Sequence, residues 1–132
     1  MTRRYSLLLA AALAACSRPA PRGPLLPETV GPWRRTELRE LPPSGSPATM
    51  PRQTVKSIHV GAYEGAGKAV ATVYELKSSA NALDMAQRWR PEPDMVFFNR
   101  DQYFVTVKWE NADRGALRGF VQALEKTIGS HR

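Results

Sequence analysis

The sequence predicts an α+β fold, an antiparallel sheet of four to five strands with two helices packed on one face. Two observations predict it. Apolar residues alternate with a period of two in two pairs of segments, and each pair is followed by a segment with helical spacing of its apolar residues. The order is therefore ββα-ββα. An antiparallel sheet of this kind leaves its other face to water, to the N-terminal segment or to a partner.

The first strand pair is predicted at residues 53–64 and 68–76. Ile58 and Val60 share one face of the first segment, as in a strand with one buried side. The second segment is apolar on both faces, which predicts a central strand. Residues 65–67, Gly-Ala-Gly, tolerate the positive φ angles of a tight antiparallel connection, so the two segments form a hairpin.

Both helices have recognisable ends. Ser78 or Ser79 caps the first helix, and Pro91 stops it. The last helix begins near Asp113 as its cap, with Gly129 as a stop signal. Its apolar residues fall on one stripe: Leu117, Phe120, Val121, Leu124 and Ile128.

The second strand pair is predicted at residues 95–98 and 102–110, about a turn at residues 99–101. Residues 34–41 alternate weakly and predict one short additional strand. The Pro- and Ser-rich residues 41–51 predict an irregular loop.

The N-terminus has the features of an export signal. Arg3 and Arg4 precede an apolar run over residues 7–15, which stops at Cys16, the only cysteine of the chain. A run this short cannot cross a bilayer as a helix. Residues 1–15 are therefore predicted to be a secretory signal peptide.

The four residues Leu13-Ala14-Ala15-Cys16 resemble the lipobox of bacterial lipoproteins, and the resemblance covers residues 1–17. It implies that the Cys16 thiol is diacylated and that cleavage precedes Cys16. The new amino group is often acylated too, with a chain such as palmitate. A plain cleaved leader with a coincidental cysteine is the alternative.

The resemblance also implies a location. Ser17 after the cysteine, rather than Asp, is similar to lipoproteins forwarded to the outer membrane, which are anchored at its periplasmic face. In a monoderm host the location would be the outer face of the cytoplasmic membrane. The remainder of the chain resembles small exported domains of unknown function.

Three segments follow from these observations: a signal peptide at 1–15, a lipidated N-terminus with a Pro-rich spacer at 16–27, and a single α+β domain at 28–132. Four prolines in residues 17–27 favour an extended spacer of about 30 Å. The precursor carries a net charge of +7, which favours anionic partners without defining a fold.

No catalytic or metal-binding motif is recognisable. Residues 61–68 differ from a phosphate-binding loop in spacing, and Ala69 replaces the Ser or Thr that would hold magnesium. His59 has no ligand spacing to other residues, so neither a metal nor another cofactor is expected. Nucleic acid is also not expected as a partner, because no motif of that class is present.

Strand aromatics predict a binding surface. If Tyr103 points inward, its neighbour Phe104 points outward, and adjacent Phe97 and Phe98 cannot both be buried from one side of a sheet. The alternative is that the N-terminal segment with Trp33 covers these rings. The predicted surface comprises Phe97, Phe98, Arg100, Phe104 and Lys108.

These features predict a membrane-anchored envelope lipoprotein of non-catalytic type, which binds an envelope protein, a lipid or a glycan. One alternative is an enzyme that acts on envelope polymers through His59 or through paired carboxylates such as Glu64 and Asp101. A second alternative is a subunit that stabilises a larger envelope complex.

Overall fold

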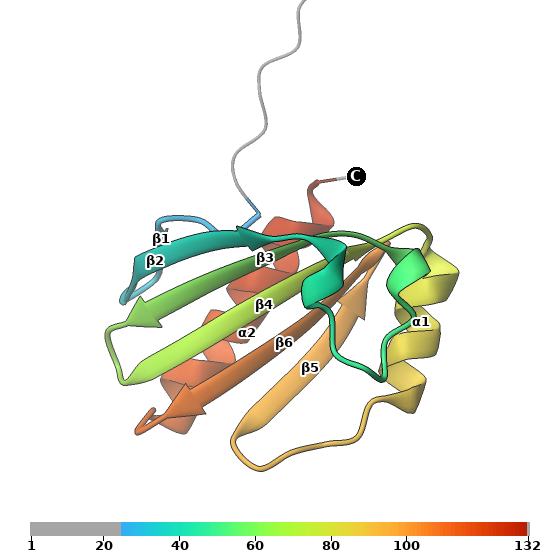
Figure 1. Cartoon of the computed structure of the whole chain (residues 1–132). Coiled ribbons are helices and arrows are strands. Elements are labelled where there is room, and N and C mark those ends of the chain that lie inside the picture. Colours follow the sequence, from blue (N-terminus) through green and yellow to red (C-terminus); the bar gives the residue numbers. More distant parts are fainter. Residues whose placement is uncertain (1–24, 132) are drawn as a thin grey trace, which may run out of the picture.

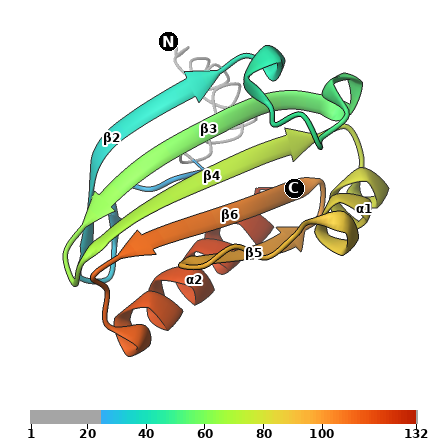
Figure 2. The same cartoon turned by 60° about the horizontal axis from the view of Figure 1, so that its bottom comes forward.

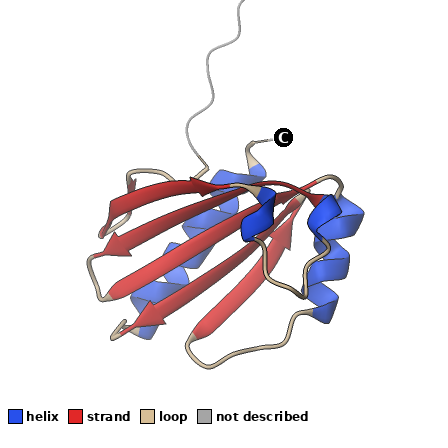
Figure 3. Cartoon of the chain, in the orientation of Figure 1, coloured by secondary structure: helices blue, strands red, loops and turns tan. Residues whose placement is uncertain are grey.

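The computed structural model describes residues 25–131 as a curved sheet with two helices (Figures 1 and 3). The predicted signal peptide, Cys16 and most of the predicted spacer lie outside the described residues. The strands are β1 (Thr29–Val30), β2 (Trp33–Leu41), β3 (Val55–Glu64), β4 (Lys68–Leu76), β5 (Met95–Arg100) and β6 (Tyr103–Glu110). The helices are α1 (Ser79–Arg88) and α2 (Arg114–Gly129), with 3-10 turns η3 (Pro43–Gly45) and η4 (Arg52–Thr54).

The six strands form one antiparallel sheet in the order β1-β2-β3-β4-β6-β5. The predicted fold class, four to five strands with both helices on one face, is wrong in both respects. The sheet has six strands, and the two helices cover opposite faces. The extra strand β1 pairs only Thr29 and Val30 with the start of β2, and a two-residue strand has no periodicity from which it could be predicted.

Several local predictions are confirmed. β4 has the predicted bounds and lies inside the sheet between β3 and β6. β3 and β4 form the predicted hairpin, whose turn contains Gly67 with a φ of +130°. A Cβ atom at Gly67 would lie 2.5 Å from the Asn111 carbonyl oxygen, so only glycine fits this turn.

Helix α2 covers one face of the sheet. Val73 of β4 and Val105 of β6 point to this face and are buried together with Leu124 and Ile128 of the helix. Among the strands, α2 approaches β1 and β5 most closely, and these are the two edges of the sheet. The sheet therefore curls around α2, which lies along its concave face (Figure 2).

Helix α1 and the 43–54 segment cover part of the opposite, convex face. Strand register places Ile58, Tyr74 and Phe104 side by side on this face. These residues are buried against Met85 of α1 and Met50 of the segment before β3. Because side chains alternate along a strand and both faces of β4 and β6 are apolar, a helix is needed on each face.

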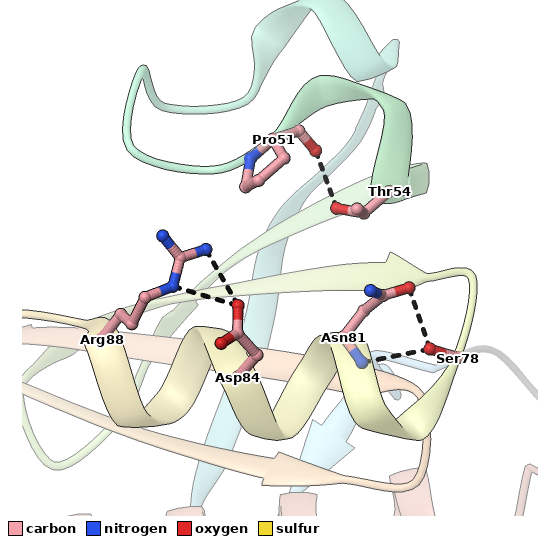
Figure 4. Close-up of polar contacts among 6 residues, drawn as sticks. All are labelled: Pro51, Thr54, Ser78, Asn81, Asp84 and Arg88. Carbon is pink, nitrogen blue, oxygen red and sulfur yellow. Dashed lines mark hydrogen bonds and ion pairs between the residues drawn. The ribbon is translucent and has the colours of Figure 1, made fainter.

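Local hydrogen bonds explain where α1 begins and how its end is held (Figure 4). The Ser78 hydroxyl accepts a hydrogen bond of 3.1 Å from the Asn81 backbone N–H, as an N-cap does. Arg88 and Asp84 form an ion pair of 2.9 Å one turn apart. The prediction that Ser78 or Ser79 caps this helix is confirmed with Ser78.

The segment before β1 is part of the folded structure. Leu26 is 1% exposed and lies in the core under α2. The Tyr63 hydroxyl donates a hydrogen bond of 2.5 Å to the Pro27 carbonyl oxygen, and Arg35 donates one of the same length to the Leu26 carbonyl oxygen. The last residues of the predicted spacer are thus held against the sheet.

Phe104→Ala tests the cover on the convex face. Phe104 is 0% exposed, so truncation leaves a cavity and should lower the free energy of unfolding by about 3–5 kcal/mol, measured by urea denaturation. The matched control is Leu83→Ala on α1, where the side chain is 49% exposed and the expected change is within about 0.5 kcal/mol. Equal, small effects of the two substitutions would contradict the burial of Phe104.

Tyr63→Phe tests the contact with the N-terminal segment. Burial raises the pKa of Tyr63 from 10.0 to about 12, although nearby Arg35 opposes the shift. Between pH 10 and 12 the unfolded chain therefore releases this proton first, and the stability of the parent falls as the pH rises. The variant should lose less stability over this range, and a residual slope from Tyr74, whose pKa burial also raises, remains. Identical alkaline slopes in chemical denaturation would show that Tyr63 is not enclosed.

Candidate functional site

The five residues of the predicted binding surface lie on two different faces of the sheet. Phe97 pairs with Thr106, and Phe98 pairs with Val105, so the two neighbouring rings point to opposite sides. Phe98 packs against the core under α2, whereas Phe97 packs against the core under α1. The structure therefore does not bring the five residues together.

Phe104 and Lys108 share the convex face but have different surroundings. The ring of Phe104 lies 5.0 Å from that of Trp89 and 5.9 Å from that of Phe97, between centroids. Lys108 is exposed on the same face. Arg100 is on the concave face, 3.9 Å from the Glu125 carboxylate. Phe104 thus forms part of the core beneath a surface on which Lys108 stands free.

The carboxylates named for paired catalysis, Glu64 and Asp101, lie at opposite ends of the sheet. Glu64 pairs with Lys68 at the start of β4, whereas Asp101 is in the turn before β6, which meets the end of β4. At about 3.3 Å per strand residue, the length of β4 separates them by about 25 Å. General acid–base catalysis by this pair is therefore excluded by geometry.

His59 belongs to a polar cluster that the sequence analysis did not identify. Its Nε2 atom lies 3.1 Å from the Ser57 hydroxyl oxygen, and its Nδ1 atom lies 3.7 Å from a Glu40 carboxylate oxygen. The Ser57 hydroxyl lies 3.0 Å from Glu75, which also pairs with Lys56 at 3.6 Å. The order Ser–His–Glu is that of a nucleophile, a base and an orienting acid.

Hydrogen bonding in this cluster does not activate Ser57. An ionised carboxylate only accepts hydrogen bonds, so the single hydroxyl proton of Ser57 is directed at Glu75. The Nε2 atom of His59 then donates to the Ser57 oxygen and cannot accept its proton. In this arrangement the cluster is a closed polar network. The shared face of Ser57 and His59 is readable from their spacing, but Glu75 joins them only through strand register.

A cleft opens on the convex face beside the part that α1 covers. Its volume is about 410 Å³. The floor consists of β4 and β6 side chains, and Trp89 and Pro47 form opposite walls. The polar and aromatic residues that line it are Thr72, Tyr74, Trp89, Glu92, Thr106 and Lys108. Val70 at its floor is 42% exposed.

Several polar groups in this cleft have no protein partner. Thr72 and Thr106 lie side by side on adjacent strands, and neither hydroxyl bonds another residue within 25–131. The Tyr74 hydroxyl likewise has no partner there, and burial raises the pKa of Tyr74, so it remains a neutral phenol. The enclosed Trp89 Nε1 also lacks an acceptor. Buried polar groups are normally hydrogen-bonded, so the cleft has unused capacity for a polar ligand.

Only Lys108 of the predicted surface lines this cleft. The alternation of Thr72 and Tyr74 along one face of β4 is readable from the sequence. Their position beside Thr106 depends on the pairing of β4 with β6, which the sequence does not reveal.

Within residues 25–131, no helix is long and apolar enough to cross a membrane, and no group of three His, Cys, Asp or Glu residues is placed to hold a metal ion. No protein-family model, curated protein or solved structure matches the chain.

Proposed function

We propose that this chain is a lipid-anchored lipoprotein of the bacterial envelope, whose folded part is a non-catalytic binding module. The N-terminal features support the anchor: two arginines, a short apolar run and Cys16 at the processing position. Two or three acyl chains on Cys16 would hold the protein persistently at a membrane, because one chain alone gives only marginal attachment. The proposed location is the periplasmic face of the outer membrane, or the outer face of the cytoplasmic membrane in a monoderm host.

The distribution of charge is consistent with this placement. Residues 25–131 contain 14 basic and 12 acidic residues, a net charge of +2. The remaining five basic residues of the chain lie outside this range, four of them within residues 1–24, where no acidic residue occurs. After removal of the leader, Arg18 and Arg22 stay next to the anchor, where they favour anionic lipid headgroups.

The observation that carries the binding function is the cleft on the convex face. Its hydroxyls, its enclosed indole N–H and the Lys108 ammonium are polar groups without protein partners, and they surround an apolar floor. Ligand sites combine an apolar lining with a few convergent polar groups in this way. Neutral hydroxyls beside aromatic rings fit the hydroxyl-rich and apolar sides of a sugar, so the proposed ligand is an envelope glycan.

Cys16→Ser tests the anchor. The variant should leave the membrane fraction and lose the acyl mass on its N-terminal peptide, as measured by cell fractionation and mass spectrometry. Ser17→Ala is the control, because it keeps the cysteine and should remain lipidated and in the membrane fraction. Retention of Cys16→Ser in membranes at the parental level would contradict lipid anchoring.

Thr106→Val combined with Lys108→Gln tests the cleft. Loss of hydrogen bonds worth about 1 kcal/mol each should weaken co-sedimentation of the full mature protein with insoluble peptidoglycan by about fivefold or more. The control is Thr36→Val with Lys126→Gln, since these residues do not line the cleft. Equal binding by both double variants would contradict the cleft as the site. Release of soluble fragments from the polymer would contradict the non-catalytic assignment.

A further inference from the structure

An apolar groove lies on the other side of the molecule, between α2 and strands β5 and β6. Its volume is about 370 Å³. Val96, Leu117 and Val121 supply apolar lining, and Trp109 contributes an aromatic ring. Arg114 and Arg118 of α2 also line it, and both are exposed. The groove is on the concave face and shares no residue with the cleft that carries the proposed function.

The two arginines oppose the stability of their own helix. Arg114 is the first residue of α2, at the positive end of the helix dipole, and the first turn contains no acidic residue. Arg118 follows one turn later, so two like charges are neighbours on the helix surface. Neither arginine forms an ion pair or hydrogen bond with another residue in the described part of the chain.

The other helical cations make this placement informative. Arg88 lies in the last turn of α1 and pairs with Asp84, and Lys126 lies in the last turn of α2. Both positions favour a cation. Local choices that disagree with the fold are expected mainly at functional sites. An anion between Arg114 and Arg118 would remove the unfavourable term.

We propose that this groove binds a long-chain fatty acid, with the acyl chain on the apolar lining and the carboxylate between Arg114 and Arg118. The combination of an apolar floor and two unpaired guanidinium groups is complementary to an amphipathic anion. The volume is near the lower end of the 300–1,000 Å³ typical of ligand sites, which suits one acyl chain better than a two-chain lipid. The proposal depends neither on lipidation of Cys16 nor on the glycan cleft.

Photo-crosslinking of a fatty acid that carries a diazirine tests this proposal in cells producing the full chain. Peptide mapping should find the label on the segments that contain Val96 or Leu117 and Val121. The Arg114→Gln/Arg118→Gln variant should lose labelling on the order of tenfold, because it removes two charge-assisted contacts to the carboxylate. Arg34→Gln/Arg90→Gln, which changes two exposed arginines outside the groove, should label like the parent.

Two further arms separate the outcomes. The double variant should melt at a higher temperature than the parent, which shows that it is folded and that the arginines carry a cost. The methyl ester of the probe should label weakly. Unchanged labelling in the Arg114→Gln/Arg118→Gln variant, equal labelling by the ester, or stronger labelling by a diazirine phosphatidylglycerol would each overturn the fatty-acid site. Labelling should persist in Cys16→Ser, so failure of the anchor and failure of this groove are distinguishable.

Discussion

The structure depends on one constraint: the central strands β4 and β6 are apolar on both faces, so neither face can be left wholly to water. The concave face is covered by α2 together with Leu26 and Trp33, whose ring lies 5.3 Å from that of Phe120. The convex face is covered by α1 and the segment with Met50, but only at one end of the strands. The uncovered end is where Val70, Thr72 and Lys108 line the cleft. The candidate site is thus a consequence of incomplete cover on one face.

Local structure could be predicted from the sequence, whereas the arrangement of elements could not. The bounds of β4 and the Asp113 cap of α2 follow from periodicity and capping chemistry, which are properties of neighbouring residues. The pairing of β4 with β6, and the side of the sheet on which each helix lies, depend on contacts between distant segments. Period-two alternation shows that a strand has two apolar faces, but it does not show which helix covers which face. The irregular 41–51 loop was predicted, yet nothing in its composition indicated that Met50 would be buried in the core.

The same division holds for the sites. Lys108 was predicted because an outward charge on a strand is visible in the alternation. Phe104 was correctly placed on the face opposite to Tyr103, but its cover is α1 and not the Trp33 segment. The Ser57–His59 network and the hydroxyl cleft need strand register, which no local pattern contains. The two arginines at the start of α2 were readable from the sequence, since they violate the usual charge preference of a helix N-terminus.

A tethered domain with covered strands and two unrelated recesses, one lined by hydroxyls and one by apolar groups and arginines, is suited to binding at an envelope surface. All of these assignments depend on the helices lying on opposite faces of the sheet. Nuclear Overhauser effects between aromatic rings test this most directly. We expect cross-peaks between Trp89 and Phe104 on the convex side, and between Trp33 and Phe120 on the concave side. Cross-peaks from Trp89 to Val105 or Tyr63, which would place α1 on the same face as α2, would contradict the account.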